Sequence, residues 1–138
     1  MEEVITFFKE MGFYDYNYFN YIKQNTIVVD KPYEEIEGFV AFYPNVFKLI
    51  LPSIKTYRDI LIWIHEYSHA LFPDDNDEIF PNIMEAFYVI NYIDDKDLID
   101  ELVDYTIGEI RRTNDPNHIS AKRMKLNAIT RKWFYFMI

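Results

Sequence analysis

Along much of the chain, apolar residues recur every three or four positions, which is the spacing of an amphipathic helix. This spacing predicts helices over residues 2–11, 14–24, 56–72, about 78–92, 96–112 and 116–129. The ends of these segments carry residues suited to helix termini. Gly12 can close the first helix, Ser53 or Thr56 can cap the third, and Pro116 suits the first turn of the last.

Three shorter stretches are rich in β-branched and aromatic residues and are predicted as strands: residues 26–30, 38–43 and 46–51. Pro44 and Asn45 form a turn signal between the last two, which indicates an antiparallel hairpin. The expected architecture is a single α+β domain over residues 1–138. In it, a small, mainly antiparallel three-stranded sheet packs against a motif-bearing helix, the following helix and further N- and C-terminal helices.

Composition narrows the classes of function. The chain has 138 residues, a formal net charge of −9 and no cysteine. Such a charge repels a phosphate backbone, so a nucleic-acid partner is not expected. Without cysteine there are no disulfides and no thiolate metal ligands. The first residues are acidic where a signal peptide is basic, and no apolar run reaches the length of a transmembrane segment. We therefore expect a soluble cytoplasmic protein.

The strongest chemical signal is His65-Glu66-Tyr67-Ser68-His69, a His-Glu-x-x-His motif within the third predicted helix. Two histidines four residues apart stand one turn above each other on one helical face, so both imidazoles can reach one Zn²⁺. Glu66 lies just round the helix, where its carboxylate can act as a general base on water held by the metal. The alternative is a chance match on a helix.

A hydrolytic zinc site needs a third protein ligand. His118 and the carboxylates are the remaining donors, and the best placed is Glu85, which apolar and aromatic residues surround in sequence. A buried, ionised carboxylate is costly unless it is paired or binds a cation, and a metal would supply that partner. The alternative is a half-exposed helical glutamate.

With these residues the chain resembles the gluzincin clan of zinc metallopeptidases, in which the third ligand is a glutamate on a helix that follows the motif. The likeness covers about residues 39–93, and the small size is similar to that of minimal gluzincins, soluble relatives of membrane metallopeptidase domains. The interval from His69 to Glu85 is shorter than in many gluzincins. Val89 stands where several of these families carry an aspartate. The resemblance implies a zincin-like fold whose edge strand pairs with an extended peptide substrate.

His118 is a second candidate catalytic residue. Its position, five residues before Arg123, is similar to a histidine-then-arginine segment of the membrane enzymes in this clan, which provides an extra donor for the oxyanion. The spacing differs from theirs, and the proline of that segment is missing. A surface histidine is the alternative reading.

The expected function is a zinc-dependent endopeptidase with a polypeptide substrate. His65, His69 and Glu85 would bind Zn²⁺, and Glu66 would transfer protons. Two alternatives stay open: a peptidase of the type that cleaves phage repressors, and a non-catalytic zinc-binding protein with a closed site.

The apolar C-terminus, residues 133–138, has three interpretations: it docks in the core, forms a homodimer or membrane-surface patch, or covers the active-site cleft. The last would make the chain a latent zymogen, as the resemblance to minimal gluzincins also implies. Residues 4–11 are the second candidate for such a cover.

Overall fold

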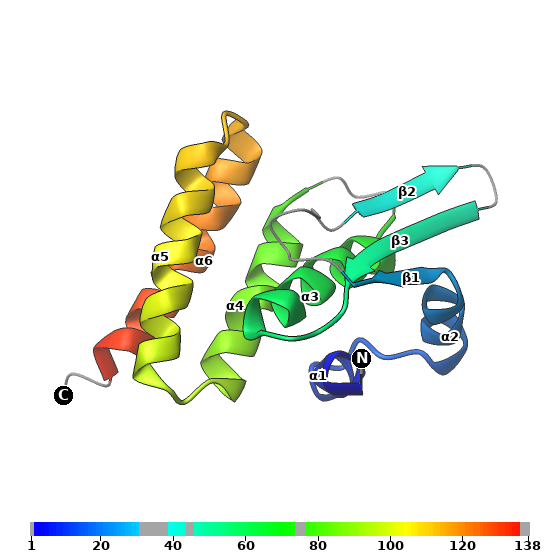
Figure 1. The fold of residues 1–138 in the computed structure, drawn as a ribbon, viewed down its shortest axis with the longest axis horizontal. Helices are drawn as coiled ribbons and strands as arrows, with labels where there is room; N and C mark the ends of the chain where they lie inside the picture. Colours follow the sequence, from blue (N-terminus) through cyan, green and yellow to red (C-terminus); the bar gives the residue numbers. More distant parts are fainter. Residues whose placement is uncertain (1, 31–38, 44–45, 74–76, 136–138) are drawn as a thin grey trace. The chain divides into compact units, whose positions relative to one another are not determined.

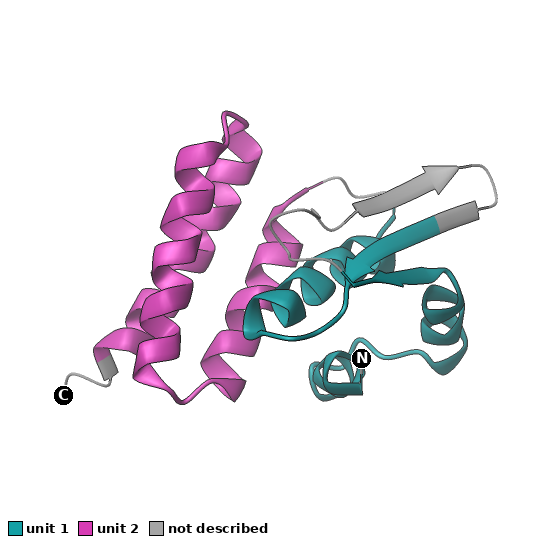
Figure 2. Ribbon diagram, in the orientation of Figure 1, with its two compact units in different colours: residues 1–75 teal, residues 76–138 magenta. Residues whose placement is uncertain are grey.

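The computed structural model describes residues 2–30, 39–43, 46–73 and 77–135 of the chain. Two compact units make up the chain, residues 1–75 and residues 76–138 (Figure 2). The predicted turn at Pro44 and Asn45, the start of the predicted strand at Gly38, and residues 136–138 of the C-terminus lie outside the described residues.

The first unit contains three helices and three strands among the described residues (Figure 1). They are α1 (Glu2–Glu10), α2 (Tyr16–Gln24), β1 (Thr26–Val29), β2 (Phe39–Tyr43), β3 (Val46–Pro52) and α3 (Tyr57–Leu71). Gly12 follows α1 with a φ of 82°, a left-handed conformation that glycine adopts without steric cost. This agrees with its predicted role in closing the first helix.

The sheet has the strand order β1-β3-β2. β2 pairs antiparallel with β3, which confirms the predicted hairpin, whereas β1 pairs parallel with β3. The described part of the chain is mostly helical, and its short sheet is mixed. The expected α+β class with a mainly antiparallel sheet is therefore wrong. β2 runs opposite to both β1 and β3. Because β3 lies between the other two strands, β1 and β3 are neighbours that run in the same direction.

Aromatic side chains form the core of the first unit. Phe7 and Phe8 of α1 are fully buried, and the ring of Phe8 stacks on Tyr67 of α3 at 6.5 Å between centroids. Phe19 of α2 contacts both Phe8 and Tyr67, at 5.7 and 6.2 Å. These contacts hold α1 and α2 against α3, so both N-terminal helices belong to the core around the motif helix.

The second unit consists of α4 (Ile79–Tyr92), α5 (Lys96–Arg112) and α6 (Pro116–Tyr135). α6 packs along both α4 and α5. Its core contains apolar residues from all three helices: Met84, Val89, Ile99, Leu102, Ala121 and Ile129. Asp95 caps α5 by accepting hydrogen bonds from the backbone N–H groups of Asp97 and Leu98 at 2.9 and 3.3 Å. The three helices begin close to where the sequence pattern predicts them.

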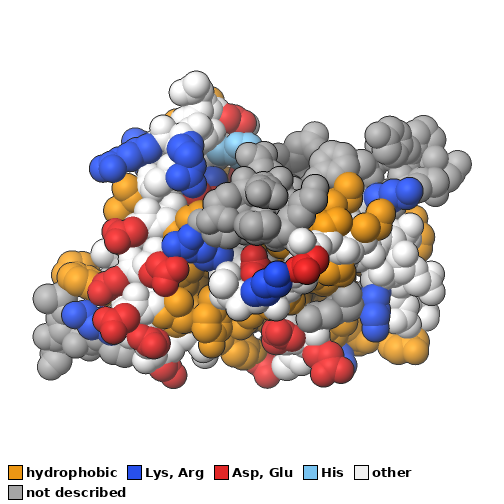
Figure 3. Space-filling model, in the orientation of Figure 1, with side chains coloured by type: hydrophobic (Ala, Val, Ile, Leu, Met, Phe, Trp, Pro, Cys, Tyr) orange, Lys and Arg blue, Asp and Glu red, His pale blue; other side chains and the backbone are white. Residues whose placement is uncertain are grey.

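Acidic side chains are visible over α5 in the space-filling view (Figure 3). This helix carries five of them, Asp97, Asp100, Glu101, Asp104 and Glu109, with Arg111 and Arg112 in its last turn. The two arginines interact favourably with the negative, C-terminal end of the helix dipole. Within the described residues, none of the helices combines the length and the apolar character that crossing a bilayer requires.

Candidate metal centre

The motif helix α3 begins at a capping box. The side chain of Thr56 accepts a hydrogen bond from the N–H of Asp59 at 3.4 Å, and Asp59 Oδ2 accepts from the N–H of Thr56 at 3.0 Å. The same oxygen accepts from the N–H of Lys55 at 2.9 Å. These bonds satisfy backbone donors at the helix start and fix where the helix begins. Thr56 is therefore the cap, one of the two residues predicted for that role.

One face of α3 is anchored in the first unit. Trp63, Ile64 and Tyr67 are buried, and Trp63 Nε1 donates to the Pro52 carbonyl at 2.7 Å. Burial raises the pKa of Tyr67, and its hydroxyl hydrogen-bonds with that of Thr26 at 3.2 Å. These contacts determine the direction in which the opposite, motif-bearing face points.

His65, Glu66 and His69 are half-buried on that other face. The imidazole centroids of His65 and His69 are 5.0 Å apart, with an interplanar angle of 70°. The structure thus brings the two predicted histidine ligands together, one turn apart on a helix with a fixed start. Two imidazoles in this arrangement can both bind one zinc ion, and Glu66 follows the first of them in the motif, in the position of a general base.

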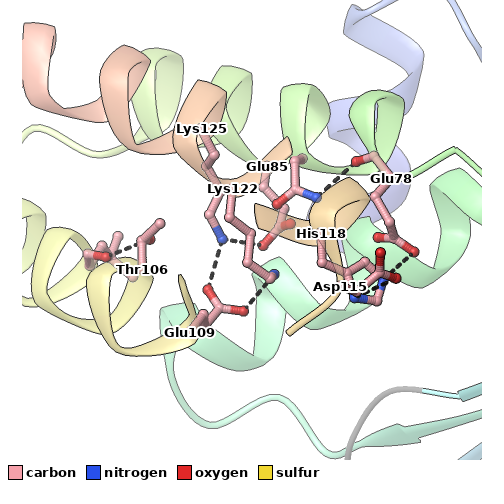
Figure 4. Close-up of polar contacts among 10 residues, drawn as sticks. Glu78, Glu85, Thr106, Glu109, Asp115, His118, Lys122 and Lys125 are labelled. Carbon is pink, nitrogen blue, oxygen red and sulfur yellow. Dashed lines mark hydrogen bonds and ion pairs between the residues drawn. The ribbon is translucent and has the colours of Figure 1, made fainter. Parts of the chain in front are cut away.

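Glu85 lies in the second unit, on α4, and is 5% exposed. Its Oε1 is 3.2 Å from Nζ of Lys125, which is 1% exposed (Figure 4). Lys125 also contacts Glu109 at 3.0 Å, and Lys122 contacts Glu109 at 2.8 Å. Two lysines and two glutamates therefore balance one another's charges in the core of the unit.

Burial alone would lower the pKa of Lys125, but the carboxylates of Glu85 and Glu109 outweigh it and raise the pKa above the ordinary lysine value. The ammonium group is thus charged at neutral pH. The sequence indicated that Glu85 is buried and needs a cation, and the structure supplies one from α6. Burial of Glu85 is therefore no longer an argument for a metal by itself.

His118 lies in the second unit too, in the first turns of α6. Its Nε2 is 3.0 Å from Oε1 of Glu78, and its Nδ1 is 3.7 Å from Oδ2 of Asp115 (Figure 4). The side chain of His118 is 39% exposed and that of Glu78 is 14% exposed. The structure therefore places the predicted oxyanion donor against a carboxylate.

Sequence reasoning missed two polar residues: Glu78, the N-cap residue of α4, and Asn82 in its first turn. Glu78 and Asn82 share a helical face with Glu85, at positions i, i+4 and i+7, and this spacing was visible in the sequence. Asn82 is fully buried, and its Nδ2 donates to the Glu78 carbonyl at 2.8 Å. Among the described residues, no donor reaches its Oδ1. A buried acceptor without a donor is costly, so this oxygen marks a place suited to a cation or a ligand donor.

Sequence reasoning also missed Lys125. Ala121, Lys125 and Ile129 are four residues apart, and all three are buried. A lysine on the apolar face of a helix requires an acidic partner, which was the available signal.

Comparisons of the chain with protein-family models, with curated proteins and with solved structures give no match. The likeness to gluzincins therefore rests on the motif residues alone.

Proposed function

We propose that the protein is a zinc-dependent metallopeptidase of the gluzincin type that acts on polypeptides. The observation that carries the proposal is the pair of adjacent imidazoles on α3 with Glu66 beside them. In this proposal His65 and His69 are two zinc ligands, and a carboxylate of the α4 segment is the third. Glu85 is the third ligand that the sequence indicates.

In peptide hydrolysis, the zinc ligands and Glu66 would have separate roles. A bound zinc ion would polarise the scissile carbonyl and acidify water. Glu66 would accept a proton from the attacking water as the new C–O bond forms. It would then return that proton to the departing amine nitrogen as the C–N bond breaks, so the carboxylate is regenerated.

Metal analysis and peptidase assays test the proposal in the full-length chain. We expect about one zinc ion per chain at neutral pH and release on acidification, because protonated imidazoles cannot bind the metal. The double variant His65→Ala/His69→Ala should lose zinc. Glu66→Gln should keep zinc but hydrolyse casein about 10²- to 10⁴-fold more slowly.

The exposed Glu10 of α1 provides the matched control, since Glu10→Gln makes the same chemical change away from the motif. It should leave zinc and hydrolysis unchanged. Full zinc occupancy in the double histidine variant would refute the proposal. Zinc that depends on the histidines, without hydrolysis by the wild type, would instead favour a non-catalytic zinc-binding protein.

A further inference from the structure

The last turn of α3 carries His69, and the end of a helix is its least constrained part. α3 ends at Leu71, so His69 lies in the last turn, whereas His65 lies one turn earlier. The last four carbonyl groups of a helix have no N–H partner within it. The position of the second imidazole therefore depends on how the C-terminal end of α3 is held.

Tyr18 of α2 provides a donor for one of these carbonyls. Its hydroxyl donates a hydrogen bond to the backbone carbonyl of Ala70, the residue next to His69. Ala70 is fully buried, and a buried carbonyl without a donor is costly. Burial raises the pKa of Tyr18 above the ordinary tyrosine value, so the hydroxyl keeps its proton at neutral pH. This bond is thus a side-chain cap on the C-terminal end of α3.

Tyr18 is itself held at a defined place. Asp15, the N-cap residue of α2, accepts a hydrogen bond from the N–H of Tyr18 at 2.8 Å. The next residue, Phe19, is buried, and its ring lies 6.2 Å from that of Tyr67 on α3, between centroids. The cap and the core contact fix the first turn of α2 against α3. The hydroxyl of Tyr18 therefore reaches the end of α3 from a rigid element.

Phe13 makes a second contact at the same end of α3. Its ring meets that of Phe72, the C-cap residue of α3, edge-on at 6.4 Å between centroids. The N–H of Phe72 in turn donates to the His69 carbonyl at 3.3 Å. Two contacts from the N-terminal part of the chain thus hold the residues that follow His69.

We infer that Tyr18 is a positioning residue for the proposed metal centre: its bond to the Ala70 carbonyl keeps the last turn of α3 ordered and the imidazole of His69 beside that of His65. The inference rests on the proposed function, in which both histidines bind zinc. Tyr18 touches neither the metal nor the substrate. A chain with a frayed last turn does not present both imidazoles, so the apparent zinc affinity falls with the fraction of chains in which this turn is ordered.

Zinc affinity of the full-length chain, measured by competition with a chromogenic chelator at one pH, tests the inference without an activity assay. Tyr18→Phe removes only the hydroxyl and keeps the ring. It should weaken zinc binding about 2- to 10-fold, the factor that corresponds to the net contribution of one hydrogen bond. Tyr16→Phe makes the same change at a tyrosine of the same helix that is 66% exposed. It is the matched control and should bind zinc as the wild type does.

Thr56→Ala separates positioning from a general loss of stability. It removes the acceptor for the Asp59 N–H at the first turn of α3, so it weakens the same helix at the end away from His69. Zinc affinity in Thr56→Ala should equal that of the wild type. An equal loss of affinity in Thr56→Ala and Tyr18→Phe would overturn the positioning role.

Hydrogen exchange locates the effect in the chain. Without zinc, the N–H groups of residues 70–72 should exchange faster in Tyr18→Phe than in the wild type. Saturating zinc should slow them again, because the metal and Tyr18 order the same turn. Exchange that is unchanged at these residues would overturn the inference.

Phe13→Leu is the second variant, and it decides the question if Tyr18→Phe does not fold. It removes the ring contact with Phe72 and should also weaken zinc binding. Wild-type zinc affinity in folded Tyr18→Phe, or in Phe13→Leu where Tyr18→Phe is unfolded, overturns the inference. In either case the proposed function stands if His65→Ala/His69→Ala loses zinc, and it fails only if that variant keeps the metal.

Discussion

At the scale of single residues, the buried ammonium group of Lys125 is paired with two carboxylates in the second unit. Taking the ammonium of Lys125 out of water is costly, and Glu85 and Glu109 offset that cost at 3.2 and 3.0 Å. The sequence indicated that Glu85 needs a cation but not which one. The choice between a metal and a lysine 40 residues away depends on helix packing, which no local pattern encodes.

The raised pKa of Lys125 predicts how stability depends on alkaline pH. Because the folded-state pKa lies above the unfolded value of about 10.4, the folded chain holds the proton more tightly. The resulting stabilisation is complete below about pH 10.4 and is lost as the pH rises towards the folded-state pKa. Urea unfolding between pH 9 and 11.5 should show this decline, and Lys125→Met should decline less.

Lys125 is not the only group whose titration lowers stability at alkaline pH. Tyr18 and Tyr67 also have raised pKa values, chiefly because of burial, so part of the loss of stability at alkaline pH remains in Lys125→Met.

At neutral pH, Lys125→Met should lower the free energy of unfolding by about 3–5 kcal/mol, because it leaves a buried carboxylate without its cation. Lys122→Met, which removes a more exposed lysine of the same network, should cost less. Equal alkaline slopes in wild type and Lys125→Met would contradict the assigned pairing.

At the scale of secondary structure, the helices were predictable because capping or helix-terminating residues stand at their ends. Thr56 starts α3, Asp95 caps α5, and Gly12 follows α1 in a left-handed conformation. The sheet was less predictable. The strands themselves are local features, but β1 joins the far side of β3 from β2, and that neighbour depends on the path of the whole chain. The error therefore lay in strand order and direction rather than in the elements.

The cap of α3 yields a prediction about the motif helix. Thr56→Ala removes the acceptor for the Asp59 N–H, which should lower the free energy of unfolding by about 0.5–2 kcal/mol. Thr56→Ser keeps a hydroxyl and should restore most of the loss. Chemical denaturation measures both variants, and hydrogen exchange should show faster exchange confined to the first turn of α3. A stability unchanged in Thr56→Ala would mean that Asp59 alone holds the helix start.

At the scale of the whole molecule, the two chain ends differ in their burial. Val4, Phe7 and Phe8 of α1 are fully buried in the first unit, so the N-terminal segment belongs to a core. Near the other end, Trp133 is half-buried, with Nζ of Lys96 6.0 Å from its ring centroid, and Phe134 is 55% exposed. The N-terminal segment is therefore a poor candidate for a removable cover, and residues 134–138 are the better one.

The last prediction concerns latency and residues 134–138, the first of which, Phe134, is exposed. Residues 134–138 are all apolar or aromatic, and covering such surface is worth about 25 cal/mol per Å². A tail of this kind competes with an extended peptide for any apolar substrate-binding surface. We therefore expect a chain truncated after Trp133 to stay folded and to hydrolyse casein faster than the full-length chain. Ending at Trp133 keeps the contact of its ring with Lys96.

Two variants make the truncation decisive. Replacing residues 134–138 by a Ser-Gly segment of the same length should raise hydrolysis as truncation does, because the effect depends on apolar surface rather than on chain length. Glu66→Gln in the truncated chain should stay inactive, which ties the gain to the proposed general base. Sedimentation of each variant separates the alternative in which the same residues form a homodimer, since truncation would then lower the mass without raising hydrolysis. Equal hydrolysis by folded, monomeric full-length and truncated chains would rule out a C-terminal cover.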